Sequence, residues 1–480
     1  MLNIKTAGEV FKHFYTISQI PRESANEKGI SDFLKQFAER LGLKVFQDEL
    51  FNLIIKKPGT LGLEGHPALI IQGHLDMVCE KNSDSTHDFS KDPIELYVDE
   101  DFLKAKSTTL GADNGIAVSM CMALMESETI PHPPLEFVLT TQEETGMSGA
   151  ENLDFSKLKA SRMINLDSSP EEVITCGSAA SSRVEYLLPV IKETPKDNAV
   201  FYEIKISGLI GGHSGGDIDK KRGNSIRIMA ELLKTIEKAS GFRISHISGG
   251  MKVNAIPREC TAVFAVSCES VHIVDELLKR SASLIKGSFK ETDPNLEISF
   301  TQTVGQELCF CRESSLKIIS SLLLIPTGII SMSTEIKGLI ALSNNIGVIE
   351  TCEDIVKITT MIRGATDELV SHLGGQIMVL ADMIRANVSF PMKSKAWPYV
   401  PGSEMLHALA ACYKDINCID PNITAVHMGL ECGIFLSNIP GLDIVSYGPS
   451  IYDLHTPMER LSISSTGRVW NILKSLLRIL

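Results

Sequence analysis

Several features are missing from this sequence of 480 residues. Its 11 cysteines include no CxxC pair, so no structural zinc clip is indicated, and we expect most of them to be reduced. The first residues lack the apolar core of a signal peptide, and no unbroken apolar run reaches the roughly 20 residues of a membrane span. We therefore expect a cytoplasmic protein that enters no membrane.

An excess of positive charge is also missing. Lys and Arg number 46 against 59 Asp and Glu, the formal net charge is -13, and neither sign forms a long block. Nucleic acids and anionic membranes require a positive surface, so both are excluded as partners. The length exceeds what one hydrophobic core supports, and we expect more than one domain.

The order of apolar segments predicts the fold class. Residues 1–180 alternate apolar strands with helices, which is typical of a covered α/β sheet. Residues 181–392 contain strands of alternating pattern with helical stretches between them, which indicates an α+β domain, and residues 393–480 return to the apolar α/β pattern. We predict an α/β domain with a covered mixed sheet, interrupted by an inserted α+β domain.

An early amphipathic helix is predicted from its start signal. Ser24 and Glu27 have capping-box spacing, and an apolar stripe runs from Ile30 to Leu41 before Gly42. The pattern therefore predicts an early amphipathic helix preceded by this capping box.

Polar residues that could carry chemistry follow the predicted strands of the α/β domain. Ligands bind at the carboxyl ends of strands in such sheets. The residues at these ends are His74 and Asp76, Asp113, Glu143 and Glu144, Asp167, and His455.

Imidazoles and carboxylates without thiolates suit zinc or a similar ion in an open catalytic site. Three carboxylates and two neutral imidazoles set -3 against the +4 of two divalent ions, and a hydroxide would bring the total to zero, so the charge count favours two ions. Asp76 could orient His74 through the second ring nitrogen. Of Glu143 and Glu144, one could bind metal while the other acts as a general base.

Each of these motifs also has an ordinary structural interpretation. A lone HxD is usually a polar loop, adjacent glutamates are usually a solvated pair, and Asp113 could simply cap a helix. The ordered coincidence of all five motifs favours the metal site. Five histidines that belong to no comparable motif are interpreted as structural or surface residues: His66, His87, His132, His246 and His427.

The motifs together resemble a known family. GHLDMV, TLGADNGIA, QEETGMSGA, INLDS and DLHTPMER occur in this order, with a large insertion before the last, and GGHSGGDI and HMGLECGIF add to the likeness. The whole chain resembles the aminoacyl-histidine dipeptidases, also called Xaa-His dipeptidases or peptidase D, which are two-zinc, lid-bearing metallopeptidases similar to carnosinase. The resemblance implies a two-zinc exopeptidase-type catalytic domain formed by residues 1–180 and 393–480.

The resemblance also implies a ligand set. One zinc would be held by His74, Asp113 and Asp167, and the other by Asp113, Glu144 and His455. Asp76 would orient His74, and Glu143 would be the general base for a water between the metals. The peptide bond from Asp113 to Asn114 would be cis.

For the inserted residues 181–392 the resemblance implies a lid that also supports a homodimer. His213 would stabilise the oxyanion, and Asn254 and Arg363 would bind the substrate's carboxylate. Glu431 and Gly429 would line the pocket for the amino end.

The implied activity is hydrolysis of unblocked dipeptides, with Xaa-His substrates including β-alanyl-histidine as the leading class. Zinc is the expected metal, and manganese or cobalt are alternatives. The alternative enzymes on this scaffold are an amidohydrolase or deacylase and an aminopeptidase. A non-catalytic peptide-binding protein is the alternative of another class, and the complete set of ligands and base argues against it.

Overall fold

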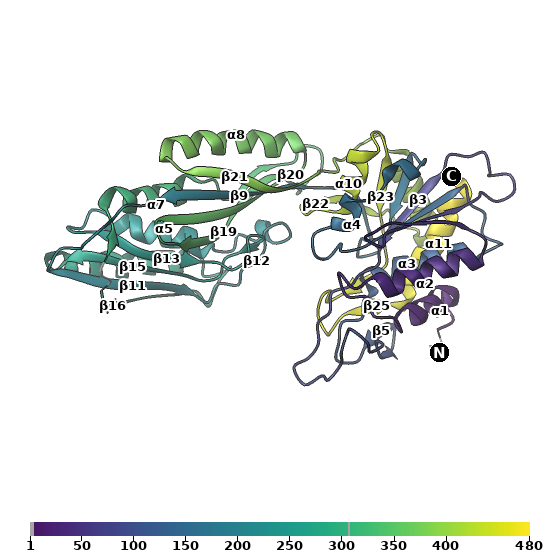
Figure 1. Ribbon diagram of the computed structural model, residues 1–480, viewed down its shortest axis with the longest axis horizontal. Helices are drawn as coiled ribbons and strands as arrows, with labels where there is room; N and C mark the ends of the chain where they lie inside the picture. The colour runs from purple at the N-terminus through teal and green to yellow at the C-terminus, as the bar shows by residue number, and fades with distance from the viewer. Residues whose placement is uncertain (1–3, 306–307) are drawn as a thin grey trace. The chain divides into compact units, whose positions relative to one another are not determined.

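The computed structural model describes residues 4–305 and 308–480, and its chain divides into two compact units (Figure 1). Unit 1 comprises residues 1–177, 397–425 and 430–480, and unit 2 comprises residues 178–396 and 426–429. The predicted borders, at 180/181 and 392/393, lie within a few residues of 177/178 and 396/397, where the chain passes from unit 1 to unit 2 and back. The short 426–429 segment has no counterpart in the sequence pattern.

Unit 1 is built around a mixed sheet with the order β1-β2-β6-β3-β7-β23-β8-β22. Its strands are β1 (Lys44–Gln47), β2 (Leu53–Lys57), β3 (Leu69–His74), β6 (Leu135–Thr140), β7 (Arg162–Asn165), β8 (Val173–Ser178), β22 (Asn422–Val426) and β23 (Asp443–Ser446). A second sheet contains β4 (Leu96–Asp99), β5 (Phe102–Ala105), β24 (Ile451–Tyr452) and β25 (Arg460–Ser462). Strand β3 pairs in parallel with β6 and β7, and β7 with β23. The central strands therefore end at one edge.

The helices of unit 1 cover this sheet. They are α1 (Gly8–Ile17), α2 (Lys28–Arg40), α3 (Ala112–Glu126), α4 (Ser148–Glu151), α9 (Glu404–Asn417), α10 (Glu431–Asn438) and α11 (Ile463–Ile479). Helix α3 packs on β3, and α9 packs on β23 and α11. Strands β3 and β6 are buried along their whole lengths, as the continuous apolar runs predict.

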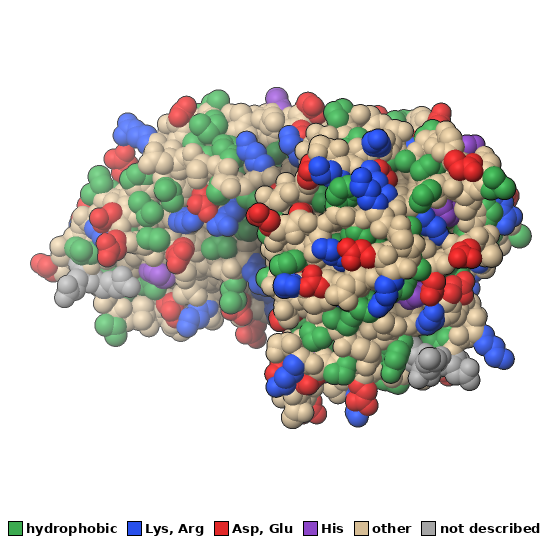
Figure 2. All heavy atoms as spheres, turned by 45° about the vertical axis from the view of Figure 1, so that its right-hand side comes forward, with side chains coloured by type: hydrophobic (Ala, Val, Ile, Leu, Met, Phe, Trp, Pro, Cys, Tyr) green, Lys and Arg blue, Asp and Glu red, His purple; other side chains and the backbone are tan. Residues whose placement is uncertain are grey.

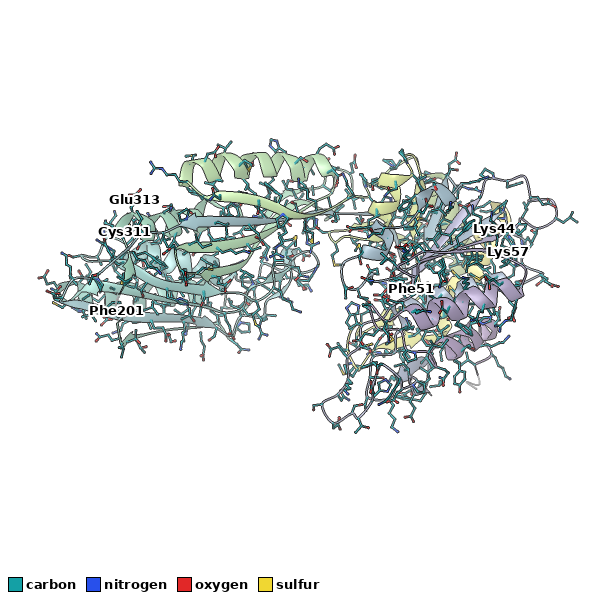
Figure 3. The ribbon with its side chains drawn as sticks, viewed as in Figure 1. Lys44, Phe51, Lys57, Phe201, Cys311 and Glu313 are labelled. Atoms are coloured by element: carbon teal, nitrogen blue, oxygen red, sulfur yellow. The ribbon has the colours of Figure 1, made fainter. Side chains whose placement is uncertain are left out.

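The β1–β2 hairpin supports the far end of α3. Figure 3 labels Lys44 and Lys57 at the open end of this hairpin and Phe51 in its turn. The Nζ atom of Lys57 donates hydrogen bonds to the carbonyls of Leu124 at 2.7 Å and Met125 at 3.2 Å. A cation at a helix C-terminus satisfies orphan carbonyls and the helix dipole, so α3 is fixed at this end.

Unit 2 has an antiparallel sheet with the order β16-β11-β15-β13-β19-β20-β9-β21, and β18 pairs with β19. Its longer strands are β9 (Ala180–Pro189), β11 (Ala199–Ser207), β13 (Arg243–Gly249), β15 (Cys260–Ser267), β16 (Glu297–Thr303), β18 (Gly328–Met332), β19 (Ile340–Thr351), β20 (Ile355–Gly364) and β21 (Asn387–Ser394). Its short strands are β10 (Lys192–Glu193), β12 (Gly212–His213), β14 (Ala255–Ile256) and β17 (Cys309–Phe310). Strand β21 continues to Ser394 in a ladder with β9, so the inserted domain extends slightly past its predicted end at residue 392.

The helices of unit 2 are α5 (Ser225–Ile236), α6 (Val271–Ser288), α7 (Arg312–Leu324) and α8 (Asp367–Ile384). Helix α8 runs along β9 and β20, as Figure 1 shows. Figure 3 labels Phe201 on β11, and Cys311 and Glu313 where α7 begins. The core includes stacked Tyr202 and Phe264 rings 5.4 Å apart. The two units confirm the predicted α/β fold with an α+β insertion.

All 11 cysteines are free thiols, as expected from their spacing. No helix in the described ranges is long and apolar enough to cross a membrane. On the face shown in Figure 2, acidic and basic side chains are interspersed, which matches the absence of long charge blocks in the sequence.

Candidate active site

The polar residues singled out in unit 1 gather at the carboxyl edge of its sheet. His74 ends β3, Glu143 and Glu144 follow β6, and Asp167 follows β7. These three strands are parallel, so their ends meet at one edge. The loop between β24 and β25 brings His455 to the same place, beside Asp113 at the start of α3.

Asp113 lies at the centre of the cluster. Its Oδ1 atom is 3.1 Å from Nε2 of His74, whose Nε2 is also 3.8 Å from Oδ1 of Asp167. Its Oδ2 atom is 3.3 Å from Nε2 of His455, which is 3.1 Å from Oε1 of Glu144. Each oxygen of one carboxylate therefore faces a different histidine and a different second carboxylate.

These spacings fit two metal ions. Ligand atoms about 2.0 to 2.2 Å from a tetrahedral zinc lie roughly 3.3 to 3.6 Å from one another. Groups of possible ligand atoms within 4.8 Å include His74, Asp113 and Asp167 as one set, and Asp113, Glu144 and His455 as another. Oε1 of Glu144 is buried and, apart from its ion-pair contact with His455, has no hydrogen-bond partner in the described part of the chain. A cation would satisfy that oxygen, and Asp113 would be shared.

Asp76 connects His74 to the two glutamates. Nδ1 of His74 is 3.1 Å from the carbonyl of Asp76 and 3.3 Å from its Oδ1. The carboxylate of Asp76 accepts hydrogen bonds from the backbone N–H of Glu143 at 3.1 Å and of Glu144 at 3.2 Å. Asp76 therefore fixes the ring of His74 and the turn after β6 together.

The expected capping box is wrong. Helix α2 begins at Lys28, and Ser24 instead donates its Oγ hydrogen to Oδ2 of Asp76 at 2.8 Å. Oε1 of Glu27 accepts from the backbone N–H of Gln142 at 2.9 Å. Both side chains bind the loops of the site because those loops present a buried carboxylate and an unpaired N–H.

The start of α3 is irregular where it carries Asp113. The peptide bond between Asp113 and Asn114 is cis, which confirms the expectation from the resemblance. Oδ1 of Asn114 accepts from the backbone N–H of His74 at 3.2 Å, and its Nδ2 donates to the carbonyl of Leu166 at 2.8 Å. Asn114 thus joins the ends of β3 and β7, a role that its sequence position alone does not reveal.

The electrostatics of the site reflect crowded, buried acids beside imidazoles. Burial raises the pKa of Glu143 to about 8, with further contributions from Glu431 and Glu144. Burial and the charge of Asp113 raise the pKa of Asp167. Burial alone would raise the pKa of Asp76, but bonds from His74 and Ser24 hold it at about 2. So many acids at one place favour a bound cation.

The histidines show the complementary effect. Hydrogen bonds with Asp113 and Glu144 raise the pKa of His455 to about 10. The pKa of His74 is raised although burial opposes this, because Asp113 and Asp76 stabilise the charged ring. Protonated His74 and His455 therefore balance the negative charge of the carboxylates, a charge that bound metal ions would otherwise neutralise.

Glu431, at the first position of α10, lies in the same unit and is buried. Its Oε2 accepts from Nε2 of Gln72 at 2.5 Å and from Oγ1 of Thr140 at 2.8 Å. Burial raises its pKa to about 7. Gly429, in contrast, ends the 426–429 segment of unit 2.

The three candidate residues of the insertion lie around one loop of unit 2. Arg363 is buried, with Nε 3.3 Å from Oγ of Ser214 and Nη2 3.4 Å from Nε2 of His213. The backbone N–H of Ser214 donates to the carbonyl of Asn254 at 2.9 Å, and the Asn254 residue is exposed. Arg363 pairs with no carboxylate in the described ranges, and burial lowers its pKa to about 10.

The hydrogen bonds of His213 indicate its tautomer. Nδ1 of His213 accepts from the backbone N–H groups of Gly215 and Gly216, both at 3.2 Å. Burial and the nearby charge of Arg363 lower its pKa to about 4, so the ring is neutral and its proton resides on Nε2. Nε2–H of His213 and the guanidinium of Arg363 are therefore neighbouring donors, 3.4 Å apart, which suits them to an anion.

His427 has polar neighbours, Ser343 and Arg363, that its sequence context does not reveal. It belongs to the 426–429 segment of unit 2, is buried, and has Nε2 at 2.7 Å from Oγ of Ser343. Burial and Arg363 lower its pKa to about 4. The only sequence signal was its place in the HMGLECGIF motif.

The chain is similar to known peptidases in sequence and in fold. The family described as peptidase dimerisation domain, M20_dimer, matches residues 204–293. The cytosol non-specific dipeptidase of Escherichia coli (strain K12) is 33% identical over 97% of this chain and 96% of that protein. The structure of aminoacylhistidine dipeptidase from Vibrio alginolyticus is 32% identical, covers 100% of this chain and 97% of that one, and superposes with a TM-score of 0.91. Aminopeptidase PepT from Bacillus cereus ATCC 10987, at 15% identity and a TM-score of 0.56 over 99% of this chain and 98% of that one, shares the fold.

Fold, site and matched domain define a metallopeptidase, a hydrolase with places for two metal ions. Within that class, the identity and coverage show that the chain belongs to the aminoacyl-histidine dipeptidase family.

Proposed function

We propose that this protein is a zinc-dependent dipeptidase that hydrolyses unblocked dipeptides, with Xaa-His substrates including β-alanyl-histidine as the leading class. The observation that carries the proposal is Asp113, whose two oxygens face His74 and His455 separately. Family membership supports a dipeptidase, and the two relatives' names, non-specific dipeptidase and aminoacylhistidine dipeptidase, make the side-chain preference the point to test.

The proposed ligands divide into two sets that share Asp113. His74 and Asp167 complete one set, and Glu144 and His455 complete the other. Nitrogen and oxygen donors suit zinc, and also manganese or cobalt. Bound ions would supply Lewis-acid chemistry at this site, polarising the scissile carbonyl and making the attacking water more acidic.

Glu143 is proposed as the general base. It stands outside both sets that share Asp113, and Asp76 fixes its backbone. A pKa raised by burial suits a group that takes a proton from the attacking water and delivers it to the leaving amine near neutral pH. Asp76 acts through His74, whose ring it orients.

The residues of unit 2 are proposed to bind the remaining parts of the substrate. The Nε2–H of His213 would donate to the oxyanion, and Arg363 with the exposed Asn254 would bind the carboxylate. The support is that Arg363 is a buried cation whose described neighbours include no counter-ion. The acidic Glu431 and the backbone at Gly429 would receive the amino end.

Unit 2, corresponding to the predicted insertion 181–392, is proposed as a lid that also mediates a homodimer in the cytoplasm. The matched dimerisation domain at residues 204–293 supports the dimer, and the cytosol dipeptidase of E. coli supports the location. Light scattering should give twice the 52.5 kDa chain mass, and a monomer would contradict the dimer.

A substrate panel tests the function. Free dipeptides, including β-alanyl-histidine and dipeptides without histidine, are compared with N-acyl amino acids and a tripeptide, each with added zinc, manganese or cobalt. We expect turnover of free dipeptides, fastest with Xaa-His. Hydrolysis confined to N-acyl amino acids would indicate a deacylase, and preference for the tripeptide an aminopeptidase.

Two variants guard against contaminating activity. Glu143→Gln should lower turnover roughly 100- to 10,000-fold, whereas Glu151→Gln removes an exposed glutamate of the same segment and should not change it. If the wild-type protein cleaves no member of the panel with any of the added metals, the proposed function is wrong.

A further inference from the structure

Glu459 is a buried carboxylate that binds the loop carrying Asp113. Its Oε2 accepts backbone hydrogen bonds from Leu110 at 2.8 Å and Gly111 at 3.0 Å. Its Oε1 accepts from Ala112 at 2.8 Å and Asp113 at 3.4 Å. Four consecutive N–H groups at the start of α3 therefore converge on one side chain, which arrives from the end of the His455 loop.

Arg22 binds the same loop through its carbonyls. Arg22 is 4% exposed, its Nη1 donates to the carbonyls of Leu75 and Asp76 at 3.0 Å each, and its Nη2 donates to the carbonyl of Gly111. Burial lowers the pKa of Arg22, and the negative charge of Glu459 acts against this shift. Two buried opposite charges thus hold the backbone of Gly111, one through its N–H and the other through its carbonyl.

Two glycines make room for this arrangement. A Cβ atom at Gly111 or Gly115 would collide with Nη2 of Arg22, and Gly111 has a left-handed φ of +69°. Side chains at these positions would displace the guanidinium, so the spacing of LGADNG is matched to Arg22.

The three loops joined in this way carry three of the proposed metal ligands. Glu459 follows His455 by four residues, Gly111 precedes Asp113 by two, and Asp76 follows His74 by two. We propose that Glu459, assisted by Arg22, is a positioning residue that fixes His74, Asp113 and His455 in the geometry required for two metal ions. This inference rests on the proposed function, and neither residue is proposed to touch substrate.

The expected defect follows from the chemistry of the contact. Glu459→Gln removes the charge and places an NH2 donor against backbone N–H donors, so part of the Asp113 loop loses its acceptor. Disturbing residues that support metal ligands typically weakens metal binding or activity about 10- to 100-fold. We expect such a loss of zinc affinity, with kcat reduced and KM changed less than threefold or so.

Asp443 offers a matched control in unit 1. Its carboxylate caps α9 by accepting from the backbone N–H of Met405 at 2.9 Å and from Oγ of Ser403. Asp443→Asn should cost comparable stability without affecting the proposed metal site. The experiment measures zinc affinity by calorimetry, melting temperature of the metal-stripped protein, and kcat and KM for a dipeptide, in wild type, Glu459→Gln and Asp443→Asn.

Weaker zinc binding in Glu459→Gln but not in Asp443→Asn supports the proposal, and equal zinc affinity in a folded Glu459→Gln overturns it. If Glu459→Gln does not fold, Glu459→Asp retains the charge with a shorter reach; intermediate zinc affinity supports the proposal, and wild-type affinity refutes it. Wild-type protein that binds no zinc and cleaves no dipeptide would instead refute the proposed function.

Discussion

Replacing Arg363 with methionine should maintain or increase the stability of the protein while lowering its activity. Burial lowers the pKa of Arg363 from the ordinary 12.5 to about 10, a difference of about 2.5. At about 1.4 kcal/mol per pKa unit, the folded protein carries a desolvation cost of about 3 kcal/mol. The side chain is charged in both states below about pH 10, so this cost applies in full at neutral pH.

The contacts that Arg363 would lose are weak. Its one hydrogen-bond acceptor among the described residues is Oγ of Ser214 at 3.3 Å, a bond worth about 1 kcal/mol or less at such a distance, and Nε2–H of His213 at 3.4 Å is a second donor that stabilises nothing. Methionine retains most of the apolar packing. We therefore expect Arg363→Met to leave the melting temperature unchanged or raise it by a few degrees.

Activity should fall strongly in the same variant. Two charge-assisted hydrogen bonds to a substrate carboxylate are worth about 3 to 5 kcal/mol, or roughly 100- to 1,000-fold or more in kcat/KM. A dipeptide and its C-terminal amide are assayed side by side, with melting measured by calorimetry. Wild type should prefer the free acid, and Arg363→Met should lose most of that preference.

The matched control is Arg280→Met, which removes an exposed arginine of α6 in the same unit and should change neither quantity. A large drop in the melting temperature of Arg363→Met would refute the desolvation reasoning. An unchanged preference for the free acid would refute the carboxylate assignment.

Three further predictions concern unit 1. Glu143→Gln should keep the wild-type metal content, measured by plasma emission spectrometry, while kcat falls roughly 100- to 10,000-fold, and substantial turnover would show that another group is the base. Chelation should lower the melting temperature and added zinc should restore it, whereas an insensitive protein would argue against the metal sites. Burial raises the pKa of Glu143 to about 8 and of Glu431 to about 7, so the folded metal-free protein retains protons that an unfolded glutamate releases near 4.5. Its stability should therefore fall as pH rises from 6 to 8, while the zinc-loaded protein should change little, and a flat metal-free profile would contradict this.

The sequence predicted those parts of the site that depend on strand ends and short motifs. His74, Glu144 and Asp167 follow apolar strands, and parallel pairing brings such positions to one edge. The apolar runs likewise identified β3 and β6 as buried strands. Local patterns suffice where the backbone itself determines which residues meet.

Residues that act across long sequence separations escaped prediction. Arg22 contacts Gly111 and Asp76, and Glu459 contacts the start of α3, yet neither has a local signature. Ser24 had a signature, the capping box, but a buried carboxylate far along the chain was the stronger partner. Pairings of this kind depend on tertiary packing, which no spacing rule contains.

The short 426–429 segment has a consequence for how the polypeptide must be handled and synthesised. The segment supplies His427, which hydrogen-bonds with Ser343. It also supplies the carbonyls of Val426 and Met428, which accept from the backbone N–H of Ala179. A fragment cut at residues 178 and 396 would leave those groups without acceptors or donors, so unit 2 is not a single excisable piece. On the ribosome, its last segment emerges after α9 and most of β22, and unit 2 completes its native contacts only when part of the other unit has already been made.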